Sequence, residues 1–289
     1  MTGLIDTVLA GILLGGIYAL FALGLSLIFG IMRLVNLAHG DLILLAAYLV
    51  LTATTALGVP LPVATVLVIV AMFILGFILQ RLVLERLLGD DILPPLLVTF
   101  GLSIIIQNGL LLVFGADSRR LQAGAFESSS IALAPGLSVG LAPLAALIVA
   151  ILVVALLQVV FYRTSLGRAF RATADNPQIA QLMGIDHRNI YAAAVGISLA
   201  VSVVAAVAFG IRANFDPSIG PARLLYAFEA VIIGGLGSLW GTLAGGIVLG
   251  LAQTIGARID PEWQILAGHL AFLAVLMVRP RGLFPSSRP

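Results

Sequence analysis

The side chains of this sequence that could do chemistry are a few polar groups set within long apolar stretches. They are Asn36, His39, Asp41, Gln107, Asn108, Gln158, Glu229, Gln253 and His269. A polar group at membrane depth is costly and tends to have a function. Such groups contact a solute that crosses the membrane, and a lone carboxylate such as Glu229 also allows proton coupling.

His39 and Asp41 lie in the stretch NLAHGDL, residues 36–42, together with Asn36. Side chains at i and i+2 do not share a helical face, so we expect these groups around a broken turn. Two roles are open to them. They cap the end of a half-helix, or they contact substrate on its pathway, as helix ends do in transporters built on repeats.

A second interruption, Gly234-Gly235-Leu236-Gly237, follows Glu229 within the apolar stretch 225–256. As one helix, about 32 residues would run roughly 48 Å, which exceeds a bilayer, so we expect a break at these glycines. Interrupted segments in both halves of a chain favour a pathway near the breaks. The expected pathway residues are Asn36, His39, Asp41, Glu229, Gly234, Gly235 and Gly237.

The residue types present argue against catalysis by this chain. All 15 basic residues are arginine, which excludes a Walker A lysine and Schiff-base chemistry, and cysteine is absent. The three histidines fall in separate segments without metal-ligand spacing, so we expect neither a metal site nor a bound cofactor. The net charge of +2 is too small to favour a nucleic-acid partner.

The elements that must position these groups are membrane helices. Hydrophobic residues make up 61% of the 289 residues and charged ones only 10%, against about 25% in a typical soluble domain. Eight apolar stretches, most of them near the roughly 20 residues that span a bilayer, predict an all-α polytopic membrane protein. They cover about 8–30, 37–57, 61–80, 93–114, 142–162, 190–211, 225–256 and 263–279.

The distribution of arginine assigns the connections to sides. The connection 163–189 carries four arginines, and the carboxyl end is arginine-rich as well, so both are expected on the cytoplasmic side. Three simple crossings after that connection would leave the carboxyl end outside, so 225–256 should not cross simply. The loops 115–141 and 212–224 then share the opposite face, either as solvated loops or as a surface for an external binding protein.

The connection at about 164–188, called the elbow below, contains the pattern of a short capped helix. Asp175-Asn176 can cap a helix that starts at Pro177, and Gly184 offers a left-handed stop. Its apolar residues share one face by i, i+3, i+4 spacing, and such a face favours a protein partner. The alternative is a helix that rests this face on lipid or on its own bundle. The apolar residues are Ile179, Leu182 and Met183.

Four stretches together resemble the integral-membrane permease subunits of branched-chain amino acid ABC importers, specifically the LivH type, over nearly the whole length. They are GGIYALFALGLSLIFGIMRLVNLAHGDLILLAAYL at 15–49, GRAFRATADNPQIAQLMGI at 167–185, FEAVIIGGLGSLWGTLAGGIVLG at 228–250 and RPRGLF at 279–284. The resemblance implies one permease domain over residues 1–289 in a bacterial inner membrane. It also implies four kinds of partner, namely the bilayer, a second permease of the LivM type, two cytoplasmic ATPases that use ATP and magnesium, and a periplasmic binding protein.

The elbow matches the permease loop that docks into the ATPase in this family. The resemblance therefore implies coupling by Arg168, Arg171, Asp175, Asn176, Pro177, Ile179, Leu182, Met183 and Gly184. Leucine, isoleucine and valine are the expected substrates, with urea, short amides or other amino acids as alternatives. A proton-coupled secondary transporter or a channel fits the composition alone, but the capped elbow favours the ABC importer.

Overall fold

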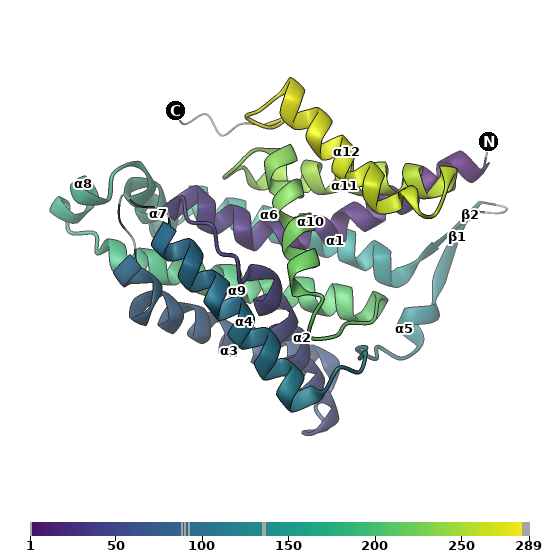
Figure 1. Cartoon of the computed structure of the whole chain (residues 1–289), viewed down its shortest axis with the longest axis horizontal. Helices are drawn as coiled ribbons and strands as arrows, with labels where there is room; N and C mark the ends of the chain where they lie inside the picture. The colour runs from purple at the N-terminus through teal and green to yellow at the C-terminus, as the bar shows by residue number, and fades with distance from the viewer. Residues whose placement is uncertain (1, 88, 90, 92, 135–136, 285–289) are drawn as a thin grey trace.

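The computed structural model describes residues 2–87, 89, 91, 93–134 and 137–284. The apolar stretches of the sequence fold into long helices packed side by side (Figure 1). In chain order the elements are α1 (Thr2–Met32), α2 (His39–Thr55), α3 (Leu61–Leu82), η1 (Leu84–Leu87), α4 (Leu93–Phe114), α5 (Ala125–Ser128), β1 (Ser130–Ala134), β2 (Leu137–Gly140), α6 (Leu141–Arg163), α7 (Ser165–Asp175), α8 (Pro177–Leu182), α9 (His187–Arg212), α10 (Gly220–Gly234), α11 (Leu239–Ile259) and α12 (Trp263–Val278).

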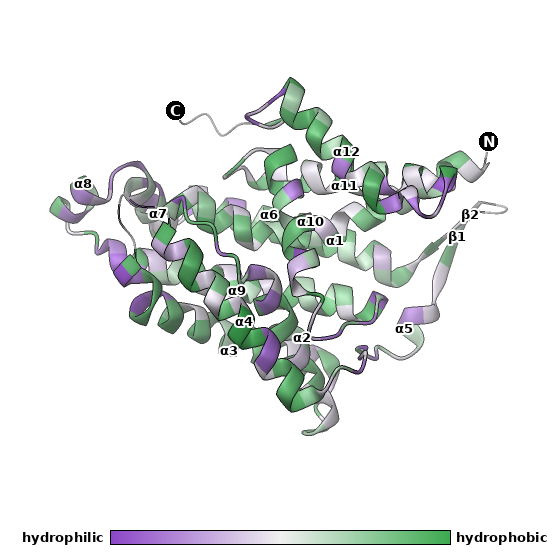
Figure 2. Ribbon diagram, viewed as in Figure 1, coloured by the Kyte–Doolittle hydropathy of each residue, from purple (hydrophilic) through white to green (hydrophobic). Residues whose placement is uncertain are grey.

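The fold is that of a multi-pass membrane protein, as the composition predicts. Among the described residues, six helices are long and apolar enough to cross a membrane, namely α1, α3 with η1, α4, α6, α9 and α11. Two more apolar helices, α2 and α12, are shorter. Figure 2 shows hydrophobic residues along the helices and hydrophilic ones gathered at α7, α8 and the connections.

Helix α1 is the centre of the packing. It is largely buried and contacts α6, α9, α10 and α11 (Figure 1), whereas only a small share of α3, α4 and α6 is buried. Glycines on α11 permit the closest approach. A Cβ on Gly246 would lie 2.7 Å from the backbone nitrogen of Ala19, and one on Gly250 would lie 2.9 Å from the Cα of Gly15. Small residues of this kind bring membrane helices together where lipid supplies no hydrophobic drive.

The predicted break in 225–256 is confirmed. Helix α10 ends at Gly234 after 15 residues, and α11 begins at Leu239. Residues 235–238, called the glycine turn below, reverse the chain with φ of 108° at Gly235 and 78° at Gly237, a region that favours glycine. Because the stretch 225–256 forms two helices, the eight apolar stretches correspond to nine helices among the described residues.

The glycine turn, the elbow and the carboxyl-terminal segment lie at one end of the bundle, called the inner end. The backbone N–H groups of Leu283 and Phe284 donate to the carbonyls of Ile233 and Gly234 at 2.8 and 2.9 Å. A cavity described below joins the turn to the elbow. The carboxyl end therefore lies at the same end as the elbow, as the arginine pattern predicts.

The first break lies earlier than the sequence pattern indicates. Residues 33–38 separate α1 from α2, while residues 39–42 form the first turn of α2 and are helical. The prediction of a break over 36–42 was therefore wrong for its second half. His39 and Asp41 interrupt the apolar pattern because they bond to neighbouring helices, as shown below, without interrupting the helix itself.

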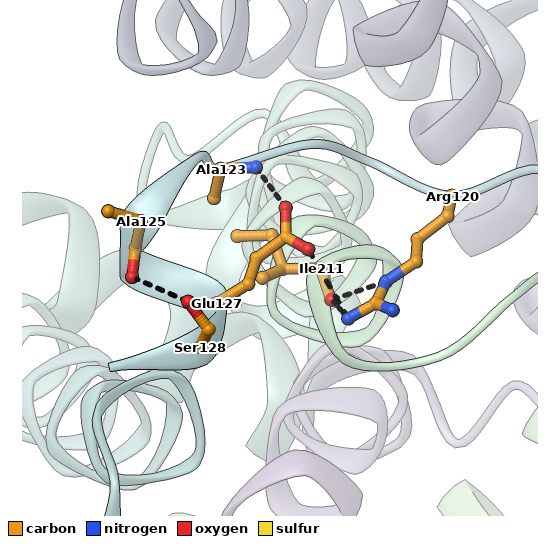
Figure 3. Close-up of polar contacts among 6 residues, drawn as sticks. All are labelled: Arg120, Ala123, Ala125, Glu127, Ser128 and Ile211. Atoms are coloured by element: carbon orange, nitrogen blue, oxygen red, sulfur yellow. Dashed lines mark hydrogen bonds and ion pairs between the residues drawn. The ribbon is translucent and has the colours of Figure 1, made fainter. Parts of the chain in front are cut away.

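The connections 115–129 and 213–219, which lie within the predicted loops 115–141 and 212–224, meet at the opposite end, called the outer end. Residues 220–224 of the second predicted loop are instead the start of α10. Arg119 and Phe215 form an isolated β-bridge with two backbone hydrogen bonds of 2.8 Å. Arg120 donates twice to the carbonyl of Ile211, at 3.0 and 2.8 Å, and pairs with Glu127 at 3.4 Å (Figure 3). A small antiparallel hairpin, β1 and β2, is the only described sheet in this otherwise helical chain.

Candidate functional site

The two short helices begin against each other. A Cβ on Gly40, in the first turn of α2, would meet the backbone of Gly220 at the start of α10. A Cβ on Gly220 would in turn meet the carboxylate of Asp41. Each helix follows a long helix and a non-helical connection, α1 with residues 33–38 and α9 with residues 213–219. In repeat-built transporters, the binding site lies where interrupted helices point the N-termini of their half-helices at the substrate.

His39 and Asp41 point to different neighbours within this junction, and both are fully buried. His39 Nε2 lies 2.9 Å from the carbonyl oxygen of Phe21 in α1. Asp41 Oδ2 accepts a hydrogen bond of 2.5 Å from the Ser103 hydroxyl of α4. Neither side chain caps α2, so the capping alternative does not hold for them. Their other polar atoms, His39 Nδ1 and Asp41 Oδ1, have no hydrogen-bond partner among the described residues.

Asn36 stabilises the backbone just before α2. Its Oδ1 accepts the backbone N–H of Ala38 at 3.0 Å, and its carbonyl accepts the N–H of His39 at 3.2 Å. It therefore fixes the backbone that leads into α2. Its side-chain Nδ2 is buried without a partner among the described residues.

One face of α4 completes the junction, and sequence reasoning found only part of it. Thr99 Oγ1 accepts the N–H of Leu37 at 3.2 Å, and Ser103 joins Asp41 to Gln107. The sequence analysis singled out Gln107 but not Thr99 or Ser103. The available signal was their i, i+4, i+8 spacing, which places all three on one helical face.

Glu229 lies farther along α10 and is not a lone acid. It is buried, and its Oε1 is hydrogen-bonded to Nδ1 of His269 in α12. One turn earlier, the Tyr226 ring lies 5.0 Å from that of Tyr18, whose hydroxyl donates to Gln253 Oε1 at 2.5 Å. A row of polar contacts thus links α10 to α1, α11 and α12.

The expected pathway residues fall into separate places. Asn36, His39 and Asp41 lie at the start of α2, Glu229 lies within α10, and the glycine turn lies at the far end of α10 from Gly220. Gly30 at the end of α1 packs against Gly237, with 3.2 Å between an added Cβ and the Gly237 Cα. Helix α10 therefore connects the junction with α2 to the inner end.

The elbow forms the capped helix that its sequence predicts. Helix α8 starts at Pro177, and Asn176 Oδ1 accepts the N–H groups of Gln178 and Ile179 at 3.0 Å each. Asp175 does not cap α8, because it is the last residue of α7. Gly184 ends the turn with a φ of 81°.

The apolar face of α8 is uncovered. The exposed fractions of Ile179, Leu182 and Met183 are 59%, 87% and 78%. The alternative in which this face rests on its own bundle is therefore wrong. Arg168 is exposed on α7, whereas Arg171 donates to the Phe161 carbonyl and lies 5.2 Å from the Tyr162 ring centre.

We expect Asn176→Ala to loosen α8, because it removes the acceptor for two backbone N–H groups. Losing such a cap costs about 1 kcal/mol, so hydrogen exchange of the α8 amides should speed up about fivefold. Asn176→Asp keeps an acceptor oxygen and should leave exchange nearly unchanged. Equal exchange in the alanine and aspartate variants would contradict a capping role.

A cavity of about 640 Å³ lies at the inner end between the elbow and the glycine turn. Arg171 and Asp175 of α7 line one side, and Gly237 and Ser238 line another. Arg33, just after α1, also lines it. The elbow and the turn that ends α10 therefore share one space, so a displacement of α7 changes the surroundings of the turn.

The described residues contain no cluster of three or more histidine, cysteine or acidic side chains that could hold a metal ion. The polar groups are dispersed along the contacts between helices.

Comparison with known proteins adds independent findings. Residues 7–278 match the family model described as branched-chain amino acid transport system / permease component. The high-affinity branched-chain amino acid transport system permease protein BraD of Pseudomonas aeruginosa is 32% identical, over 94% of this chain and 93% of that protein. The corresponding protein LivH of Escherichia coli is 29% identical, over 94% and 92%.

A solved structure has a similar fold. It is PsaBC from Streptococcus pneumoniae in complex with Fab, with a TM-score of 0.51 and 12% sequence identity. The alignment covers 94% of this chain and 91% of that one. At this identity the likeness concerns the fold alone.

Proposed function

The chain belongs to the family of branched-chain amino acid transport system permease components, and from this premise we propose how its parts act in transport. It is a membrane permease subunit of an ABC importer for branched-chain amino acids. We propose that α2 and α10 border the translocation pathway and that the elbow couples it to ATP hydrolysis in partner subunits. The observation that carries the coupling proposal is the uncovered apolar face of α8 beside a cavity that the elbow shares with the glycine turn.

The partners of the importer are part of the proposal. A second permease of the LivM type completes the pathway, and two cytoplasmic ATPases bind the inner end of the pair. A periplasmic binding protein meets the outer end, where the loops 115–129 and 213–219 are joined by the bridge between Arg119 and Phe215. This places the chain in the inner membrane of a bacterium, with the elbow in the cytoplasm.

The proposed coupling is mechanical. When the ATPases close, they move α8, and α7 moves with it because the two helices are separated only by Asn176. Arg171 and Asp175 on α7 border the cavity that Gly237 and Ser238 of the glycine turn also border. The turn ends α10, so its displacement shifts α10 relative to α2 and exchanges access between the two sides. ATP and magnesium are used by the partner subunits.

Uptake by the reconstituted importer tests this function. Vesicles that hold this chain with its second permease, ATPases and binding protein should accumulate labelled leucine only when both ATP and binding protein are present. Unlabelled isoleucine and valine should compete, and urea should not. Uptake of urea but not of leucine would mean that the importer carries urea and not branched-chain amino acids. Uptake that is driven by a proton gradient without ATP would favour a secondary transporter.

A further inference from the structure

The first turn of α10 carries a cation, Arg223, that forms no ion pair among the described residues. The Arg223 guanidinium lies 4.3 Å from the ring centre of Phe209 in α9 and 5.8 Å from that of Tyr226. Among the described residues it forms no hydrogen bond or ion pair, and its Nε is buried without a partner. A charge that is partly removed from water is costly unless a counter-charge is supplied. The site is therefore incomplete in the chain alone.

Asp216 lies within electrostatic range of Arg223 but forms no ion pair with it. Asp216, in the connection before α10, is occupied by the backbone N–H and the hydroxyl of Ser218, which donate to its Oδ1 at 2.9 and 2.5 Å. Asp216 forms no ion pair within the described part of the chain. Arg212, a second cation at the end of α9, lies within electrostatic range of Tyr18, as Arg223 does. The local charge therefore favours an anion.

The shape of Arg223 favours a carboxylate. A guanidinium presents two parallel N–H donors that match the two oxygens of a carboxylate. The flanking rings of Phe209 and Tyr226 hold the guanidinium by cation–π contacts and provide apolar surface beside it. A ligand with a carboxylate next to a hydrocarbon side chain would satisfy both features.

The same side of α10 carries an acidic residue, Glu229, farther along the helix. Arg223, Tyr226 and Glu229 follow at i, i+3 and i+6, which keeps them within one side of the helix. Glu229 Oε2 has no hydrogen-bond partner among the described residues. The helix thus presents first a cation and then an acid along its length, a pattern that suits a zwitterion.

We propose that Arg223 binds the α-carboxylate of the transported amino acid, with Phe209 and Tyr226 beside its side chain and Glu229 as the next contact for its ammonium group. This inference rests on the proposed transport function and identifies the α-amino acid zwitterion as the class that this surface selects. A neutral solute such as urea cannot form an ion pair with Arg223.

The first test compares variants in vesicles that hold the complete importer with saturating binding protein. Arg223→Gln should lower the rate of leucine uptake about tenfold to a hundredfold, the range expected when hydrogen bonds between charged groups are lost. Arg223→Lys keeps the charge without the paired donors and should be intermediate. The matched control is Arg258→Gln, since Arg258 is exposed and its hydrogen bonds among the described residues go to Gly3 and Thr7.

A second test needs no variant and therefore does not depend on folding. Phenylglyoxal labels arginine, and peptide mass spectrometry of the wild-type importer reads the labelling at Arg223 and Arg258 separately. Excess leucine should protect Arg223 but not Arg258, while leucinamide and urea, which lack a carboxylate, should protect neither.

Equal leucine uptake by wild type and Arg223→Gln, or no protection of Arg223 by leucine, would overturn this inference alone. Absence of ATP-dependent leucine uptake by the wild-type importer would instead overturn the proposed function. The two failures are therefore distinguishable.

Discussion

Replacing Leu182 with Asp should abolish co-purification of the ATPase subunits with the permease and reduce ATP-dependent leucine uptake to background. Leu182 is 87% exposed in the chain and lies between Ile179 and Met183 on the uncovered face of α8. An apolar side chain at the centre of an interface contributes about 2–4 kcal/mol, and a buried aspartate without a partner adds a further penalty. A loss of this size weakens binding by about thirtyfold to a thousandfold or more.

The variant should leave the membrane part of the protein intact. Leu182 makes little contact with its own bundle, so membrane insertion and association with the second permease should be normal. Leu182→Met is the matched control, because it keeps an apolar side chain of similar volume and should retain both the ATPases and uptake. Normal ATPase co-purification with Leu182→Asp would contradict docking through α8. It would favour the alternative in which the exposed face of α8 rests on lipid.

The elbow was predictable in detail because its structure depends on local rules. Asn176 before Pro177 and Gly184 after the apolar face act through backbone groups a few residues away, so their spacing was sufficient. The break at the glycine turn was predictable for a similar reason, since a bilayer limits helix length. The arginine pattern predicted the carboxyl-terminal segment and the elbow on one side, and residues 283–284 do lie at the same end of the bundle as the elbow.

The junction between α2 and α10 was not predictable, because its contacts join residues that are far apart in the chain. Ser103 lies 62 residues from Asp41, and His269 lies 40 residues from Glu229. A broken turn was predicted at His39 and Asp41 because side chains at i and i+2 do not share a helical face. The fold satisfies them from α1 and α4 and so permits a continuous helix there. Arg223 was assigned to the loop 212–224, whereas it lies in α10 and its guanidinium contacts the Phe209 ring of another helix, α9.

We expect Gly40→Ala to destabilise the protein and to reduce uptake at least about tenfold. An added methyl group at Gly40 would meet the carbonyl of Gly220 and lie 2.9 Å from the backbone nitrogen of Leu224. These are backbone atoms of α10, which cannot rotate away as a flexible side chain can. Overpacking of this kind costs about 1–3 kcal/mol, which would lower the thermal midpoint of the purified chain by about 3–10 °C.

The matched control is Gly101→Ala in α4, where an added Cβ has no atom within 4 Å. Alanine is the better helix former, so this variant should have an unchanged or slightly higher thermal midpoint. If Gly40→Ala had the same stability and uptake as Gly101→Ala, the close contact between α2 and α10 would not be required for either. A loss confined to Gly40→Ala would instead mean that the two short helices must touch. Because α10 also ends at the glycine turn beside the elbow cavity, the junction is then the point where movement at the inner end reaches the middle of the bundle.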